Sequence, residues 1–413
     1  MGQAIEKNRQ YYKFGLYGFL KNLRFYESFL ILFFLEKGID YLKIGLLYSI
    51  REITIILLEI PSGLIADILG RKKTLMASFL FYIVSFIIFY FSNHFLLMAF
   101  AMMFFAIADA FRTGIHKAMI FQYLKSRGKS SQKTDYYGHT RSWSQAGSAL
   151  SSLIAAFMVF YYGSYKIIFS ASVIPYIFDF VLISTYPAFL NGEIKHFDQS
   201  TLWEKSKYIF KAFYQSFKEL EFLRLLTSLS LYTGYYKAVK DYIQPIMMSL
   251  ALTVPFFTNL GNKQKTALVV GVIYFFIYIL TAHVSRRSGR FMELYKNHAK
   301  PMNLTLIIGF SAGIVSGLFY SVQLFWVSII IFIFILMIEN LRKPIGIAYF
   351  AELSQDEAMA TVLSVQSQSQ SLFTAIIALI VGITAQYAGV GIGISLATAL
   401  LLIFFPLYRL KEK

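Results

Sequence analysis

The sequence contains no cysteine, and charged residues make up only 15% of its 413 residues. The absence of cysteine excludes disulfides, thiolate metal ligands and cysteine nucleophiles together. The histidines are scattered without the His-x-x-x-His spacing of a metal site, and no serine motif for nucleophilic catalysis is present. These absences disfavour an enzyme, including a membrane-embedded acyl or glycosyl transferase. We expect no metal and no other cofactor.

Apolar residues are abundant instead, since hydrophobic residues account for 57% of the chain and aromatic residues for 18%. Apolar stretches recur at lengths near the ~20 residues that cross ~30 Å of hydrocarbon as a helix. They lack the alternation of a membrane barrel, and open sheet edges cannot face lipid. The sequence therefore predicts an all-α, multi-pass protein of the lipid bilayer. Its roughly twelve predicted spans cover residues 14–36, 42–68, 74–92, 95–124, 138–162, 166–187, 222–250, 265–285, 301–320, 323–352, 359–384 and 388–408.

The formal net charge of +17 raises the question of a nucleic-acid partner, and the distribution of the charge argues against one. With the N-terminus placed inside, most Lys and Arg outside the spans fall in cytoplasmic segments. The basic residues left in external segments are Lys37, Lys43, Lys166, Lys263 and Lys265. This asymmetry follows the positive-inside rule. It predicts both termini in the cytoplasm and a place in the inner, or plasma, membrane of a bacterium-like cell.

The residues 188–221 form a long polar interval that divides the predicted spans into two equal groups. We predict an N-terminal six-helix bundle at 1–187, a cytoplasmic connector at 188–221 and a C-terminal six-helix bundle at 222–413. Within the connector, apolar residues alternate with lysines as in an amphipathic helix that lies on the inner membrane face. Both a simple tether and a regulatory element fit this pattern.

The two halves show weak internal repetition, which is typical of transporters built from structural repeats. The predicted fourth span carries Asp109-x-x-Arg112, and the predicted tenth span carries Glu339-x-x-Arg342. The pair Gly70-Arg71 likewise has a counterpart in Gly289-Arg290, although the acid that precedes the first pair is missing from the second. The repetition supports two related halves.

Charged residues inside the predicted spans are costly, at about 2.5–3.5 kcal/mol each at the bilayer centre on insertion scales, so each should face a partner or a cavity. Steps of three residues let Arg24 meet Glu27, and the i to i+4 spacing permits a pair between Lys237 and Asp241. Two interpretations stay open: salt bridges between helices, or cations that grip an anionic substrate. Snorkelling towards the interface accounts for shallow cations such as Lys117, Arg141 and Lys343.

The candidate lining of a substrate cavity is the set of polar residues deep within these spans. In the eleventh span, a run of serines and glutamines serves either helix packing or the lining of an aqueous path. The candidates for the cavity are Lys21, Arg24, Glu27, Arg51, Arg112, His116, Lys237, Lys240, Asp241, Gln244, Gln366 and Gln370. Three acids beside basic residues, Glu27, Asp109 and Asp241, are the candidate proton carriers, together with Arg112.

The segment between the second and third spans reads GLIADILGRKKTL and carries Gly63, Asp67, Gly70 and Arg71. It resembles the loop after the second helix in the major facilitator superfamily of transporters, apart from Ile68, where the family usually has a basic residue. The resemblance implies twelve helices in two six-helix bundles related by a pseudo-twofold axis, a central cavity and alternating access. It also implies a cytoplasmic latch, with Asp67 at the inner end of span eleven and Arg71 paired with an acid.

Two further positions bear on the same resemblance. Arg112 matches in place the fourth-helix arginine that many members use in proton coupling. The fifth span lacks the glycine-proline pattern of drug/proton antiporters and offers Gly147, Ser148, Ser151 and Ser152 instead. This departure lowers the case for multidrug efflux.

The residues and the resemblance together predict a monomeric secondary transporter that moves a small solute by alternating access, with protons as the expected driving ion. An organic anion is the preferred substrate class. The main alternative is proton-driven efflux of amphipathic drugs or cations, and an alternative of another class is a non-transporting receptor or lipid translocase on the same fold. The pattern does not indicate the direction of transport.

Overall fold

The computed structural model describes residues 6–129, 132–192, 207, 220–255, 259–295, 297–353 and 359–411. Regular structure within these residues is helical, and they contain no strand. The all-α prediction is therefore confirmed. Among the described residues, eight helical stretches are long and apolar enough to cross a membrane, and the shorter helix Val390–Ile403 is also apolar.

The helices follow the predicted spans closely along the chain. In the first half they are α1 (Arg9–Lys21), α2 (Leu30–Glu36), α3 (Tyr41–Leu69), α4 (Arg71–Phe91), α5 (Phe95–Arg112), α6 (Ile115–Ser126), α7 (Lys133–Tyr162), α8 (Ile167–Ser184) and the short 3-10 helix η2 (Ala188–Asn191). In the second half they are α10 (Leu220–Val239), the 3-10 turn η3 (Lys240–Tyr242), α11 (Ile243–Thr253), α12 (Asn262–Arg286), α13 (Ser288–Glu293), α14 (Ala299–Ser321), α15 (Phe325–Leu353), α16 (Met359–Ala388), α17 (Val390–Ile403) and α18 (Phe405–Tyr408).

Several predicted spans are interrupted, which the hydropathy pattern did not indicate. The span predicted at 14–36 loses its helix between α1 and α2, the one at 95–124 breaks between α5 and α6, and the one at 222–250 passes through η3. Gly114 makes the second break, because its φ of 78° lies in the left-handed region that glycine adopts without strain. Charged candidates lie at each interruption, so the breaks decide where those side chains point.

The chain folds into two compact units. Unit 1 holds Met1–Phe29, Thr54–Leu202 and Val270–Tyr278, and unit 2 holds Leu30–Ile53, Trp203–Val269 and Ile279–Lys413. The packing thus groups Leu30–Ile53 with the second unit. The predicted division at the connector stays a prediction, and its amphipathic helix lies outside the described residues.

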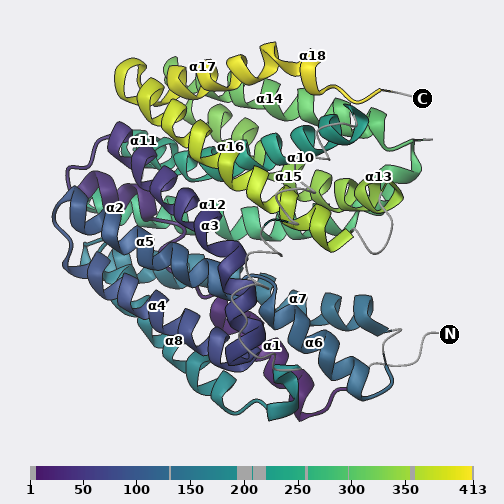
Figure 1. Ribbon diagram of the computed structural model, residues 1–413. Helices are drawn as coiled ribbons and strands as arrows, with labels where there is room; N and C mark the ends of the chain where they lie inside the picture. The colour runs from purple at the N-terminus through teal and green to yellow at the C-terminus, as the bar shows by residue number, and fades with distance from the viewer. Residues whose placement is uncertain are drawn as a thin grey trace. The chain divides into compact units, whose positions relative to one another are not determined.

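In unit 1, α4 lies between α5 and α8, and α1 packs along α7 (Figure 1). The contact between α1 and α7 is close because both helices carry glycine where they meet. A Cβ on Gly18 would lie 2.7 Å from Ser144 Oγ, and a Cβ on Gly147 would strike the carbonyl oxygen of Phe19. Small residues of this kind let helix backbones approach within a membrane.

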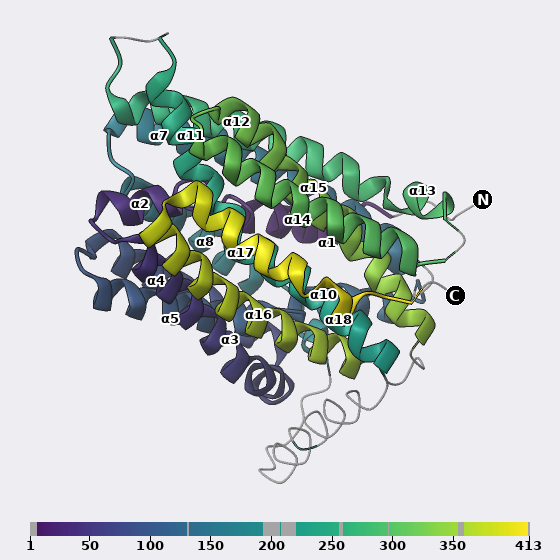
Figure 2. The same ribbon diagram turned by 90° about the horizontal axis from the view of Figure 1, so that it is seen from above.

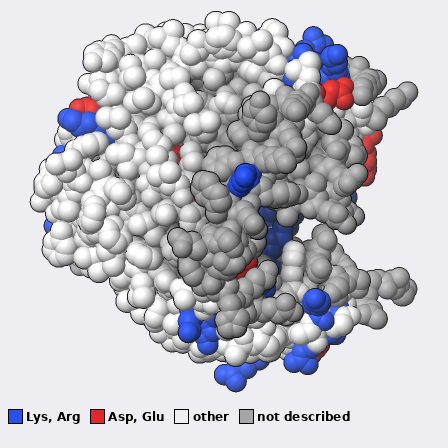
Figure 3. Space-filling model, in the orientation of Figure 1, with Lys and Arg blue, Asp and Glu red and all other residues white. Residues whose placement is uncertain are grey.

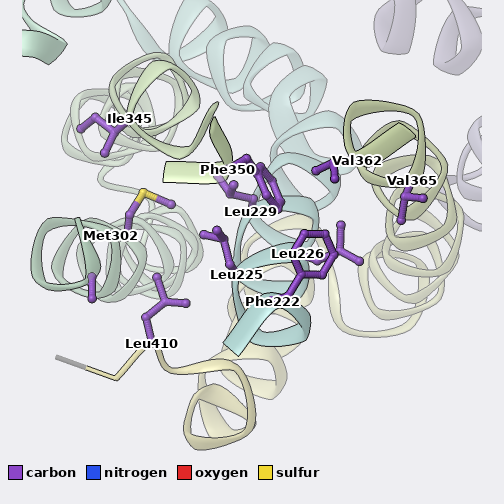
Figure 4. Close-up of a cluster of buried hydrophobic side chains, with 11 residues drawn as sticks. Phe222, Leu225, Leu226, Leu229, Met302, Ile345, Phe350, Val362, Val365 and Leu410 are labelled. Atoms are coloured by element: carbon purple, nitrogen blue, oxygen red, sulfur yellow. The ribbon is translucent and has the colours of Figure 1, made fainter. Parts of the chain in front are cut away.

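In unit 2, α14 runs beside α15 and α17, and α10 runs beside α16 (Figure 2). Gly309, Gly313 and Gly317 follow one another at four-residue intervals on α14 and face the tyrosines of α10 and the backbone of α17. A buried cluster fills the space at one end of this unit. Figure 4 shows Phe222, Leu225, Leu226 and Leu229 of α10 packed with side chains of α14, α15 and α16 and with Leu410.

The composition of the surface is that expected of a protein in contact with lipid. Many large apolar side chains are exposed, among them Leu57, Phe91, Leu96 and Tyr387. Figure 3 shows a broad area of the visible face without Lys, Arg, Asp or Glu, with charged side chains towards its margins. Apolar exposure on this scale is unfavourable in water and favourable in hydrocarbon.

Candidate functional site

A cavity of about 130 Å³ lies within unit 1, between α1, the junction of α5 and α6, and α7. It is open and lined mainly by polar and aromatic side chains. The lining residues are Phe14, Tyr17, Gly18, Lys21, Arg112, Gly114, His116, Lys117, Ile120, Tyr137, Thr140, Arg141 and Ser144. Three of the predicted cavity residues, Lys21, Arg112 and His116, therefore come together here.

Two of these groups lie on either side of the helix break at Gly114. Arg112 is the last residue of α5, and His116 stands in the first turn of α6. Thr113 ends α5 by donating its backbone N–H to the carbonyl of Asp109. In a continuous helix the four residues from Arg112 to His116 would turn through about 400°, which leaves the two side chains about 40° apart on one face. With the break between them, both side chains still line one cavity.

Arg112 is held in place by two groups on neighbouring turns and helices. Its Nη2 lies 2.9 Å from Asp109 Oδ1, and its Nε donates to the hydroxyl of Tyr82 over 2.9 Å. Tyr82 in turn donates to the Asp109 carboxylate. The guanidinium keeps 18% of its side-chain surface exposed. It is thus oriented by its partners and still accessible from the cavity.

The cavity has a strongly cationic lining. Lys21, Lys117 and Arg141 join Arg112, and no carboxylate appears among the described residues of the wall. The ammonium of Lys117 stands 5.4 Å from the ring centres of both Phe121 and Tyr137, in a cation–π arrangement. The sequence interpretation assigned Lys117 and Arg141 to snorkelling; the structure places both on the cavity wall.

An aromatic floor accompanies these cations. The His116 ring stacks on Tyr17 with a centroid separation of 3.6 Å and an interplanar angle of 15°. Its Nε2 lies 3.2 Å from the hydroxyl of Tyr186. A flat apolar body can therefore pack against these rings while an acidic group reaches the cations.

Arg24 and Glu27 form the ion pair that their spacing allowed, with 3.5 Å between Nη1 and Oε2. The expected continuous helix is wrong at this point, because both residues lie in the non-helical segment between α1 and α2. The two side chains keep 26% and 20% of their surface exposed. The pair is a polar element of unit 1, and neither residue is among those that line the cavity.

The remaining charged candidates gather in unit 2. Lys237 does not pair with Asp241 as the spacing permitted; its Nζ lies 3.8 Å from Glu52 Oε2 on α3. The carboxylate of Asp241 instead forms an ion pair with Lys240, with 3.0 Å between Nζ and Oδ1. It also accepts a hydrogen bond from the hydroxyl of Tyr48 over 2.6 Å. Lys237 and Asp241 do not pair because the 3-10 turn η3 at Lys240–Tyr242 is tighter than an α-helix and removes the i to i+4 register between them.

Arg51 and the candidate glutamines complete this group. Arg51 donates to Glu52 through Nη2 at 2.8 Å and lies over the ring of Tyr48. Gln244 accepts the backbone N–H of Ile31 over 2.9 Å, so it caps the start of α2. Gln366 is buried on α16, where its carbonyl accepts Ser230, and Gln370 is partly buried one turn further on. These contacts serve packing within unit 2.

The proposed gating motif is built on the junction of α3 and α4. Gly70 has a φ of 86° and lets the chain turn directly into α4, while Gly63 has open space around it. Arg71 donates to the carbonyl of Ala118 at 3.5 Å, and it has no acidic ion-pair partner among the described residues. The expected pairing of Arg71 with an acid is therefore not found there. Asp67 is partly buried, and its latch with span eleven stays a prediction.

Sequence reasoning missed several lining residues, and it did not select one buried acid as a site residue. Tyr17, Tyr137, Thr140 and Ser144 line the cavity from two helices without any motif in the sequence. Glu52 is buried and links α3 to α10 through Lys237. The sequence did contain a sign of its importance, because a carboxylate in the middle of an apolar span is costly and is expected to have a partner.

Transporters that carry solutes across the bilayer typically have broken helical spans around a polar binding site. The broken spans, buried ion pairs and cationic cavity of this chain fit that class. The comparison with known families gives the same class. Residues 23–338 match the Major Facilitator Superfamily, and the chain belongs to this family. It is a membrane transporter of that type.

The relatives agree with this assignment. The chain is 23% identical over 386 residues to the uncharacterized MFS-type transporter YxaM of Bacillus subtilis (strain 168), covering 93% of this chain and 90% of YxaM. The crystal structure of the nucleoside transporter NupG superposes with a TM-score of 0.74 at 13% identity, over 98% of this chain and all of NupG. A POT family transporter in complex with 5-aminolevulinic acid superposes with a TM-score of 0.67 at 12% identity, over 97% and 96% of the two chains. At these identities the structures support the fold alone.

Proposed function

We propose that this transporter carries a small organic anion by alternating access, with the cavity of unit 1 as its binding site and protons as the driving ion. The observation that carries the proposal is the cationic wall formed by Lys21, Arg112, Lys117 and Arg141. A carboxylate or phosphate there would receive charge-assisted hydrogen bonds, which are about twice as strong as neutral ones. The ring pair of Tyr17 and His116 suits an anion with a flat apolar body.

Proton coupling is the finer part of the proposal. The predicted carriers Glu27, Asp109 and Asp241 each lie next to a cation, at 3.5, 2.9 and 3.0 Å respectively. Protonation of any of them would release that cation, and the released charge would become available to a substrate or to a second acid. This is a physical route by which a proton and an anion share one set of basic residues.

The test is transport by the purified full-length protein in proteoliposomes with an imposed pH gradient. Carboxylates, phosphates and amphipathic cationic dyes are compared for uptake and efflux. We expect uptake of at least one anion, faster when protons flow with it, and a loss of about tenfold or more in Arg112→Gln, since one charge-assisted bond contributes about 1.5–3 kcal/mol. Efflux of dyes without transport of any anion would refute the anion assignment.

A further inference from the structure

The cavity of unit 1 has more cations in its wall than the surrounding helices have acids to balance them. Most of the wall comes from α1, α6 and residues 136–162 of α7, and these segments contain no Asp or Glu. Asp109 on α5 is the described acid that forms an ion pair with a wall cation, and that cation is Arg112. Neither oxygen of Asp179, the buried acid on α8, accepts a hydrogen bond, so this acid does not hold Lys21.

The three other cations of the wall keep their charge for a bound anion. Lys21, Lys117 and Arg141 form no ion pair with an acid in the described part of unit 1. The ammonium of Lys117 lies 5.4 Å from two aromatic ring centres, a contact that stabilises the charge without neutralising it. Like charges around one small space repel each other. A ligand with a single negative charge would leave much of this repulsion in place, so the wall favours an anion with more than one charge.

The size of the cavity favours a compact anionic group. Its volume of about 130 Å³ is well below the ~300–1,000 Å³ of pockets that enclose drug-sized ligands. Tyr137, Arg141 and Ser144 lie on one face of α7, because they follow one another at steps of four and three residues. That face therefore presents hydroxyl groups next to a guanidinium. Such a mixture of charged and neutral donors matches a tetrahedral group with several acceptor oxygens.

We propose that the substrate is an organic phosphomonoester and that its phosphate group binds in this cavity, against Lys21, Arg112, Lys117 and Arg141. This inference rests on the proposed anion transport and narrows its substrate class. A phosphomonoester carries a charge of about −1.5 to −2 at pH 7 on three acceptor oxygens of one group. A dicarboxylate has a similar charge but divides it between two separate groups. Binding and transport make or break no covalent bond.

The test compares two ligands that share a ring and differ in charge. Phenyl phosphate is a monoester, and methyl phenyl phosphate is a diester with a single negative charge. Benzoate and phthalate supply the monovalent and divalent carboxylates. We expect the purified full-length protein to bind phenyl phosphate about tenfold or more tightly than the diester, because a second charge adds charge-assisted hydrogen bonds. In proteoliposomes, excess phenyl phosphate should block uptake of labelled phenyl phosphate, and an equal excess of the diester should not.

Variants of the wall show whether this preference arises in the cavity. Lys21→Gln, Lys117→Gln and Arg141→Gln each remove one cation, and each should reduce the preference for monoester over diester by several-fold. None of the three breaks an ion pair between described residues, so the variants should melt close to wild type. The matched control is Lys13→Gln, because Lys13 also lies on α1 but donates to Thr185 and does not line the cavity. It should keep the wild-type preference.

The outcomes separate this inference from the proposed anion transport. Equal affinity for the monoester, the diester and benzoate would overturn the phosphomonoester assignment and leave anion transport standing. Tighter binding of phthalate than of phenyl phosphate would overturn it in favour of a dicarboxylate. An unchanged preference in all three folded wall variants would show that the phosphate binds elsewhere. Absence of binding by all four anions would overturn both the anion assignment and this inference.

Discussion

The sequence repeats an acid-x-x-arginine motif in its two halves, and the structure uses the two copies differently. Asp109 and Arg112 on α5 pair with each other, and Arg112 faces the cavity with 18% of its side chain exposed. Glu339 and Arg342 on α15 make no such ion pair in the described part of the chain. Glu339 accepts a hydrogen bond from the hydroxyl of Thr233 over 2.9 Å. Arg342 donates hydrogen bonds to the hydroxyls of Thr305, over 2.9 Å, and Ser228, over 3.2 Å.

The helix around each motif explains the difference. α5 ends at Arg112, and the turn at Gly114 opens the wall of the cavity. α15 continues to Leu353, so Arg342 stays inside the bundle with 1% of its surface exposed and lies 4.9 Å from the ring centre of Tyr232. The arginine at the end of a helix thus lines a cavity, and the arginine inside a continuous helix packs in the interior. The comparison teaches that a motif's role depends on whether its helix continues.

The largest effect is expected at the buried copy. Arg342→Ala removes a cation that joins α15 to α10 and α14 and leaves Glu339 buried with one positive charge fewer. Breaking a buried charged network typically costs about 3–5 kcal/mol. We expect a clear loss of thermal stability and of folded protein in detergent. Unchanged melting with loss of transport would move Arg342 to the transport machinery instead.

The exposed copy should respond in the opposite way. Arg112→Gln removes the guanidinium from the cavity but keeps a polar group near Asp109. Because the pair is partly exposed, we expect a stability loss of about 1 kcal/mol or less and a loss of anion affinity of about tenfold or more. Melting temperature and equilibrium binding on the same sample provide the comparison with Arg342→Ala.

The helix break itself can be tested at Gly114. Alanine there must adopt a positive φ, which costs about 1–2 kcal/mol, although the added methyl meets no atom within 4 Å. We expect lower stability and weaker anion binding together, since the turn orients Arg112 and His116. Gly138→Ala is the matched control, because the added methyl also meets open space but the residue lies within the helix α7. We expect this substitution to raise the free energy of unfolding by about 0.5–1 kcal/mol. Equal behaviour of the two variants would remove the turn from the explanation.

The smallest effect is expected for Tyr82→Phe. It deletes the hydroxyl that connects Arg112 with Asp109 and leaves their direct contact in place. One such hydrogen bond contributes about 0.5–1.5 kcal/mol. We expect a few-fold change in anion affinity, and an effect as large as that of Arg112→Gln would show that the tyrosine itself contacts the substrate.

The sequence predicted the helices, the family and the motif at Arg112, because these depend on hydropathy and on short spacings. It did not predict the partners of the buried charges. Tyr48 reaches Asp241 across 193 positions and Thr233 reaches Glu339 across 106, and no local spacing encodes either contact. The pair that spacing permitted between Lys237 and Asp241 does not form for a different reason: Asp241 lies in a 3-10 turn, which the hydropathy pattern does not reveal.

The candidate cavity was predicted in part. Lys21, Arg112 and His116 were selected because charge and imidazole groups are costly in a membrane span. Tyr137, Thr140 and Ser144 carry no such penalty, so composition alone could not distinguish them from packing residues.

The most direct test of the central claim is equilibrium binding of the transported anion to purified wild type and Arg112→Gln. If the cavity of unit 1 is the binding site, the variant stays folded and binds about tenfold more weakly or worse. If wild type and variant bind the anion equally well, the cationic cavity is not the substrate site.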